Sequence, residues 1–261
     1  MQSGFVLQQP RLTPVVKGLL FSLVAVFVLQ LSLATFARFP VEPVLGFSPT
    51  MFFSGFVWQI ASYPFLHGGL FHLLINCAIL YMVGAELERR WGSKKFLTFY
   101  AVCAVGGAML QSLIWLGALV LGYDNFSQLV GSTPVVGASG ALYGLFMAFG
   151  LLYGESRVLF MLVVPMKAKH FAALIVGIEL FSSIFYSNSG VAHAVHLGGL
   201  AAGFVLLKLR GPNLDGGGGG GFFRKKTKSM DRDEVSRRLK LVSKPQSQES
   251  SAKTKYPITW N

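Results

Sequence analysis

Six long apolar runs occupy most of the first 210 residues of this 261-residue chain. They cover residues 15–36, 70–86, 96–121, 136–153, 170–186 and 191–209. Each run is close to the roughly 20 residues with which an α-helix crosses a bilayer. Because backbone polar groups in lipid must be satisfied within the protein, spanning segments of this kind fold as helices. We therefore predict an all-α fold: a polytopic membrane protein with a bundle of six transmembrane helices.

The composition excludes an ordinary soluble domain. Charged residues make up 13% and hydrophobic residues 52% of the chain, whereas about 25% of a soluble domain is charged. The two cysteines, Cys77 and Cys103, lie inside apolar runs, so we interpret them as small buried hydrophobic residues rather than a disulfide. No small-residue cleavage site accompanies the first run, and we interpret it as a retained span rather than a signal peptide.

Lysine and arginine gather in every second connection between the runs. Apart from Arg38, the basic residues around the spans are Arg11, Lys17, Arg89, Arg90, Lys94, Lys95, Arg157, Lys167, Lys169, Lys208 and Arg210. Connections rich in Lys and Arg stay on the cytoplasmic side of a membrane. We therefore predict that both termini are cytoplasmic.

The chain divides into three parts. Residues 1–14 form a short cytoplasmic N-terminus, and residues 15–209 form the six-span domain. Residues 210–261 begin as a glycine-rich linker and continue as a basic tail, which we expect to be disordered and to face membrane lipids. No nucleic-acid-binding motif accompanies this charge, so we expect no nucleic-acid partner. Between the first and second runs, proline, phenylalanine and tryptophan favour a segment sunk in the membrane interface.

Ser139 stands in the sequence Gly137-Ala138-Ser139-Gly140, at the external start of the fourth run. Flanking glycines let other backbone approach closely. The free N–H groups at a helix N-terminus stabilise a developing negative charge, which suits a nucleophilic serine that generates an oxyanion. Small residues also pack membrane helices together. From this pattern alone, helix packing explains the residues as well as catalysis does.

His196 supplies the second part of the pattern. A serine needs a general base, most often histidine, to become a good nucleophile. Gly199 and Gly203 are four residues apart and share a helix face with His196, so a neighbouring helix can pack closely there. The fourth run is the natural neighbour. A histidine that is simply hydrogen-bonded inside the bundle is the alternative.

His72 and Asn76 lie four residues apart, on one face of the second run. Their donors can point at a shared oxyanion, but hydrogen bonds between helices would also use them. His67 and His72 raise the further possibility of a metal site. Zinc would need additional ligands, and no His-Glu-x-x-His motif occurs. We therefore expect neither a metal nor a cofactor.

Asp124 is the only aspartate before the tail, which excludes an intramembrane aspartyl protease.

Together these motifs resemble the rhomboid family of intramembrane serine proteases. The resemblance covers residues 58–209. It comprises His67, His72 and Asn76, the sequence Glu88-Arg89-Arg90-Trp91-Gly92, the stretch from Gly137 to Gly144, and His196 with Gly199 and Gly203.

The resemblance implies the fold and the roles of the residues. The fold is a six-transmembrane-helix bundle with a membrane-embedded first loop. Ser139 and His196 form a dyad without a third acidic member, and Tyr143 packs against His196. His72, Asn76 and the backbone N–H of Ser139 form the oxyanion hole. The fifth span is mobile and admits transmembrane protein substrates. The compact form looks most like members from bacterial or archaeal cytoplasmic membranes.

Some features depart from the family or have no assigned role. Some relatives carry Trp-Arg where this chain has Trp58-Gln59. Neither Glu179 nor His193 receives a role from the resemblance, and nothing in the sequence sets an oligomeric state. Two other functions stay open: a non-catalytic rhomboid-like protein that binds transmembrane segments, and a transporter. The first would lack the nucleophile or the base, and the second would show inverted repeats, which the sequence does not.

Overall fold

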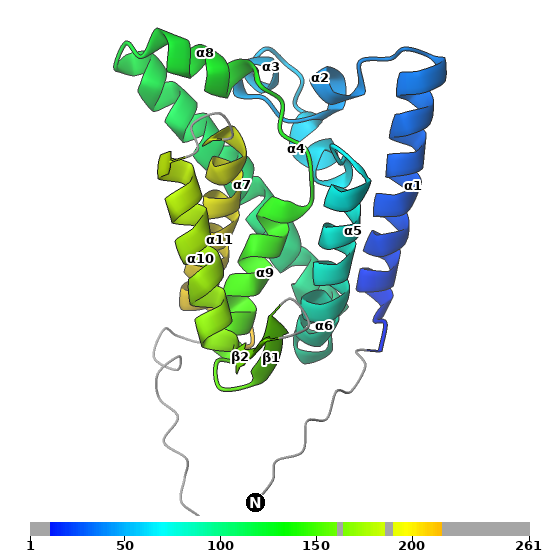
Figure 1. Ribbon diagram of the computed structural model, residues 1–261, viewed down its shortest axis with the longest axis vertical. Coiled ribbons are helices and arrows are strands. Elements are labelled where there is room, and N and C mark those ends of the chain that lie inside the picture. Colours follow the sequence, from blue (N-terminus) through cyan, green and yellow to red (C-terminus); the bar gives the residue numbers. More distant parts are fainter. Residues whose placement is uncertain (1–10, 161–163, 186–189, 216–261) are drawn as a thin grey trace, which may run out of the picture. The chain divides into compact units, whose positions relative to one another are not determined.

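A computed structural model describes residues 11–160, 164–185 and 190–215, all of which belong to one unit, Met1–Phe222. A helix lies at each of the six apolar runs (Figure 1). These helices are α1 (Pro14–Phe36), α5 (Leu70–Ile79) continuing through the π-helical turn η2 (Leu80–Gly84) into α6 (Ala85–Trp91), α7 (Ser93–Val120), α9 (Ser139–Leu152), α10 (Ala168–Phe185) and α11 (Gly190–Arg210).

Three of these helices are long and apolar enough to cross a membrane. Within the described part of the chain they are α1, the continuous helix Leu70–Trp91, and α7. The helix α9 is apolar but shorter, with 14 residues. Large apolar side chains remain exposed on the outside of the helices, among them Phe21 and Val120. Such a surface is stable in lipid and would aggregate in water.

Short elements join the long helices at one end. They are α2 (Val41–Leu45), α3 (Pro49–Phe53), α4 (Gln59–Ser62), the 3₁₀ turn η1 (Tyr63–Phe65) and α8 (Asp124–Ser132). Figure 1 shows α2, α3 and α8 at the end opposite the β1–β2 hairpin. A single pair of backbone hydrogen bonds between Phe47 and Val135 ties the first connection to the segment that leads into α9.

Gln59 holds the first connection together. Its side chain is fully buried. The amide nitrogen donates to the carbonyl of Pro43 at 3.0 Å, and the amide oxygen accepts from the backbone N–H of Ser48 at 3.2 Å. The indole of Trp58 donates to the carbonyl of Val44 at 2.9 Å. An uncharged amide therefore anchors this loop.

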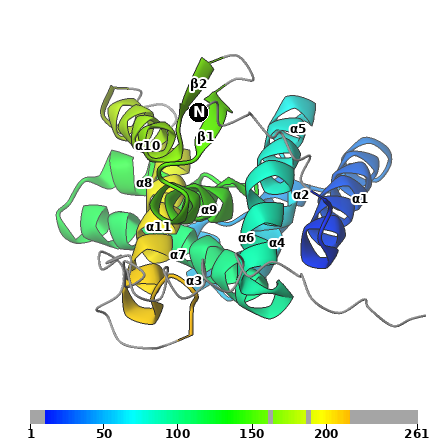
Figure 2. The ribbon, with the colours of Figure 1, turned by 90° about the horizontal axis from the view of Figure 1, so that it is seen from below.

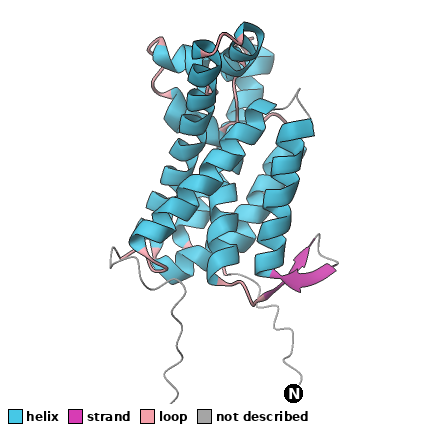
Figure 3. Cartoon of the chain, turned by 90° about the vertical axis from the view of Figure 1, so that its left-hand side faces the viewer, coloured by secondary structure: helices cyan, strands magenta, loops and turns pink. Residues whose placement is uncertain are grey.

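The prediction of an all-α chain is wrong for one segment. Two strands, β1 (Arg157–Phe160) and β2 (Val164–Lys167), pair as an antiparallel hairpin between α9 and α10 (Figure 3). Outside the hairpin, Glu155 accepts hydrogen bonds from Lys167, at 2.7 Å, and from Lys169. The bond from Lys167 is the main reason that the pKa of Glu155 falls to about 2. The hairpin escaped prediction because its strands are only four residues long.

Glu88 fastens the beginning of α1 to α6. Its carboxylate is buried and accepts from the backbone N–H groups of Val15 and Val16, at 3.0 and 2.9 Å. It also accepts from the hydroxyls of Thr13 and Ser93. The carboxylate thus satisfies N–H groups that the first turn of a helix leaves free, next to the positive end of the helix dipole.

The residues that follow α11 contact the junction between α6 and α7. The indole of Trp91 donates to the carbonyl of Pro212 at 3.0 Å, and Lys95 donates to the carbonyl of Asn213 at 3.2 Å. The first residues of the predicted linker are therefore bound to the end of α6 and the start of α7. The rest of the predicted tail, from residue 216 on, lies outside the described residues.

The helices α7, α9 and α11 pack closely because glycines line their contacts. A Cβ atom placed on Gly199 of α11 would overlap the carbonyl oxygen of Gly140 on α9. One turn later, a Cβ atom on Gly203 would lie 3.1 Å from the Cα of Gly144. Seen from below, α9 lies beside α11, with α7 and α10 around the pair (Figure 2). This close approach sets the position of the groups described next.

Candidate active site

Ser139 is the first residue of α9. The chain enters this helix through Gly137, whose φ of +122° is in a region that side-chain-bearing residues rarely adopt. The N–H of Gly137 donates to the carbonyl of Tyr63 at 2.9 Å, which fixes the turn before the serine. The sequence therefore needs a glycine at 137 for conformational reasons, and the resulting turn places the Ser139 hydroxyl at a helix N-terminus.

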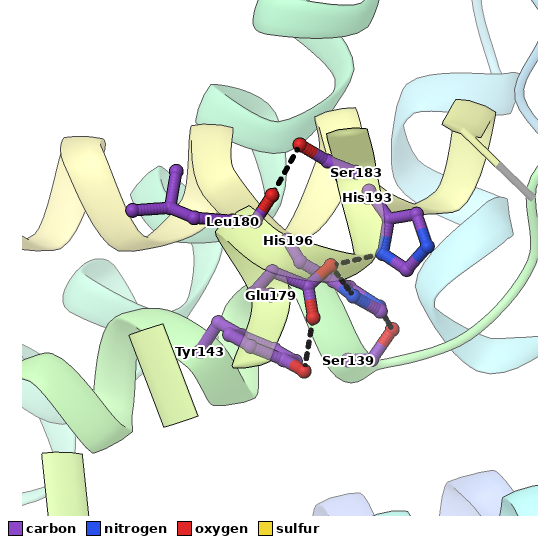
Figure 4. Close-up of polar contacts among 7 residues, drawn as sticks. All are labelled: Ser139, Tyr143, Glu179, Leu180, Ser183, His193 and His196. Atoms are coloured by element: carbon purple, nitrogen blue, oxygen red, sulfur yellow. Dashed lines mark hydrogen bonds and ion pairs between the residues drawn. The ribbon is translucent and has the colours of Figure 1, made fainter. Parts of the chain in front are cut away.

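His196 of α11 reaches this hydroxyl. Its Nε2 lies 2.7 Å from the Oγ of Ser139 (Figure 4). The contact joins residues that are 57 positions apart, and the glycine contacts between α9 and α11 make it possible. The His196 side chain is 18% exposed, so the pair is not sealed inside the bundle.

Tyr143 fixes the plane of the His196 ring. It follows Ser139 by one helical turn on α9. Its ring stacks on the imidazole with a centroid distance of 4.3 Å and an interplanar angle of 9°. A stacked contact of this kind restricts rotation of the imidazole about its Cβ–Cγ bond.

Glu179 of α10 lies behind the histidine, where the resemblance implied no acidic group. Its side chain is only 4% exposed. The Oε1 atom lies 2.8 Å from the Nδ1 of His196 and 2.6 Å from the Nδ1 of His193, and Oε2 accepts from the hydroxyl of Tyr143 at 2.6 Å (Figure 4). The sequence held a signal, because Glu179 is the only carboxylate in the fifth apolar run. It gave no partner.

His72 and Asn76 of α5 face the turn that precedes Ser139. A Cβ atom placed on Gly137 would lie 2.8 Å from the Nε2 of His72 and 3.7 Å from the Nδ2 of Asn76. Asn76 is buried, and its Nδ2 has no hydrogen-bond partner among the described residues. The ring of His67 is fully buried and meets the ring of His72 edge to face at 5.0 Å. An unpaired buried donor is costly, and such donors are found where a ligand or a reacting group completes them.

A metal ion would find one possible group of ligands in the described part of the chain. The ligand atoms of Glu179, His193 and His196 lie within 4.8 Å of one another. The hydrogen bonds between the two rings and the carboxylate already account for this closeness. The geometry therefore requires no ion at this place.

The chain is similar to known proteins over the region that holds these residues. The Rhomboid domain family matches residues 54–213. The chain is 29% identical over 156 residues to RHOMBOID-like protein 4 of Arabidopsis thaliana. It is 27% identical over 147 residues to Rhomboid protease GluP of Bacillus subtilis, and 28% identical over 154 residues to Rhomboid protease AarA of Providencia stuartii.

These alignments cover 57%, 56% and 57% of this chain, respectively. They cover 33%, 25% and 54% of the three relatives, so each relative contains long regions that this chain does not match.

Proposed function

This chain belongs to the rhomboid family, and from that premise we propose that it is an intramembrane serine endopeptidase. It cleaves peptide bonds in or near the transmembrane segments of other membrane proteins. The observation that carries the proposal is the 2.7 Å contact between the Oγ of Ser139 and the Nε2 of His196. Nucleophile and base within hydrogen-bond reach are the signature of an activated serine.

In the first step, the Ser139 oxygen forms a bond to the carbonyl carbon of the scissile peptide. The hydroxyl proton passes to the Nε2 of His196, and the carbonyl oxygen becomes an oxyanion. The C–N bond then breaks, and His196 returns the proton to the leaving amine. Water, activated by the same histidine, hydrolyses the acyl-enzyme and restores Ser139.

The oxyanion is stabilised by donors that the fold holds in place. They are the side chains of Asn76 and His72 and the backbone N–H of Ser139 at the start of α9. The unpaired Nδ2 of Asn76 supports this assignment, since a donor without a ground-state partner is free to bind charge that develops during the reaction.

The chain is an integral multi-pass membrane protein. We propose that all six long helices span the membrane and that residues 37–69 form a membrane-embedded first loop. The start of α1, the α6–α7 corner and the end of α11 meet at one end of the bundle, where the basic connections lie. Both termini are then cytoplasmic, and the site opens toward the external side of a bacterial or archaeal cytoplasmic membrane.

The test of the function is cleavage in a defined bilayer. The purified full-length chain is reconstituted in liposomes with a tagged protein that contains one transmembrane helix. We expect two fragments, with the cut in or near the transmembrane segment. If a panel of such substrates stays intact but binds to the folded protein, the non-catalytic function holds instead.

The oxyanion donors give a separate prediction. Replacing Asn76 by alanine should lower kcat by about 10²- to 10³-fold with a smaller change in KM, because the lost donor acts on the transition state. His72→Ala should have an effect in the same direction. The control is Ser32→Ala on α1, which removes a hydroxyl bonded to the carbonyl of Val28 in its own helix. Steady-state kinetics on the single-helix substrate measures both constants. A change in KM with kcat intact would assign Asn76 to substrate binding.

A further inference from the structure

The geometry points to Glu179 as a positioning residue that makes the Ser139–His196 pair into a Ser–His–Glu triad. The inference rests on the proposed function and deepens it, because the family resemblance implies a dyad without an acidic member. Glu179 acts through His196 and does not touch the substrate. The three members come from three helices: α9 carries the serine, α11 the histidine and α10 the glutamate (Figure 4).

The proposal takes Glu179 as ionised, and this selects one tautomer of His196. An ionised carboxylate only accepts hydrogen bonds, so the imidazole Nδ1, 2.8 Å from Oε1, then carries a proton. Nε2 is then the unprotonated nitrogen. It lies 2.7 Å from the Ser139 hydroxyl, in the position needed to accept the proton. The opposite tautomer would turn an N–H toward the nucleophile and would leave no base.

The charge of Glu179 matters most during the reaction. When the Ser139 proton moves to His196, the imidazole becomes positive inside a bundle where charge is poorly solvated. A carboxylate beside Nδ1 stabilises that cation, as the aspartate does in the Ser-His-Asp enzymes. Because the carboxylate is already in place before the reaction, it stabilises the charge without rearrangement of the site.

Two further residues hold the carboxylate still. The hydroxyl of Tyr143 donates to Oε2 at 2.6 Å. His193 lies one turn before His196 on α11, and its Nδ1 is 2.6 Å from Oε1. Tyr143 also stacks on His196, so one side chain orients both the base and its acidic partner. A glutamate that served only to tie α10 to α11 would not need this arrangement around the base.

The test compares Glu179→Gln with wild type in the full-length reconstituted protein. Glutamine keeps the size and the hydrogen-bonding capacity of the side chain but not its charge. We expect kcat for cleavage of the single-helix substrate to fall by about 10²- to 10⁴-fold with KM changed by less than about threefold. The rate of Ser139 labelling by a fluorophosphonate should fall in parallel. Glu155→Gln, the same substitution at an exposed position just before the β1–β2 hairpin, should behave as wild type.

A spectroscopic readout covers the case in which Glu179→Gln does not fold. In wild-type protein with ¹⁵N-labelled histidine and a phosphonylated Ser139, the proposal requires that His196 carries a proton on both ring nitrogens. Its Nδ1 proton, shared with Glu179, should then appear far downfield in the proton NMR spectrum. The signal is assigned by its loss in His196→Ala and its persistence in His193→Ala.

The outcomes separate the two proposals. If wild type neither cleaves nor is labelled, the proposed function fails and this inference fails with it. If wild type does both and Glu179→Gln does so at the same rates, only the role of Glu179 is overturned. Absence of the downfield signal from the folded, phosphonylated wild type also overturns it.

Discussion

Replacing Ser139 by alanine is expected to lower kcat/KM for cleavage of the single-helix substrate by about 10⁴-fold or more. The variant keeps every donor of the proposed oxyanion hole and the whole base, but it has no oxygen to attack the carbonyl. His196→Ala should give a loss of similar size, because residues that act as a unit lose most of their effect when either is removed. Quantitative gel analysis of the two fragments over time measures both rates.

The controls for this prediction concern folding. Ser139 is half-buried at the start of α9, and alanine fits the same helical position. The thermal unfolding temperature of Ser139→Ala should therefore stay close to that of wild type. Cleavage by Ser139→Ala within about tenfold of the wild-type rate would show that another residue attacks the substrate.

The second large effect is expected at the contact between α9 and α11. A side chain on Gly199 would overlap the backbone carbonyl of Gly140, and this backbone cannot yield without separating the two helices. We expect Gly199→Val to destabilise the fold by about 3 kcal/mol or more, since overpacking against rigid backbone is at the upper end of core substitutions. Unfolding of the purified protein in mild detergent by added denaturing detergent measures the loss.

The same substitution should also reduce activity in the fraction that still folds, because it moves His196 away from Ser139. The control is Gly177→Ala on α10, where a Cβ atom meets nothing within 4 Å. That variant should be as stable and active as wild type. If Gly199→Val were stable and fully active, the close packing of α9 on α11 would not be what positions the base.

Sequence reasoning located the helices well because lipid imposes a strong and local constraint. An apolar run near 20 residues in length has few alternatives to a helix, and the structure has a helix at all six runs. The short elements were harder. The helix α8 has nine residues and the two strands of the hairpin have four each, so their sequence patterns are short.

In the candidate site, too, local sequence patterns were predictive and contacts between distant residues were not. The spacing of Gly199 and Gly203 predicted a close helix contact on the face of His196, and the glycine pattern around Ser139 pointed to a helix start. The partners of Glu179 were out of reach, since the contacts to Tyr143 and His196 join residues 36 and 17 positions apart. Gln59 is a similar case, because its anchoring role becomes visible only when the carbonyl of Pro43 is seen beside it.

The most direct test of the central claim is to find which atom reacts with a fluorophosphonate. The wild-type chain, its Ser139→Ala variant and its His196→Ala variant are treated in membranes, digested and analysed by mass spectrometry. The account predicts a phosphonyl adduct on the peptide that contains Ser139. It also predicts no adduct in Ser139→Ala and labelling at least about 10²-fold slower in His196→Ala. An adduct on another residue, or labelling of Ser139 at the same rate without His196, would contradict it.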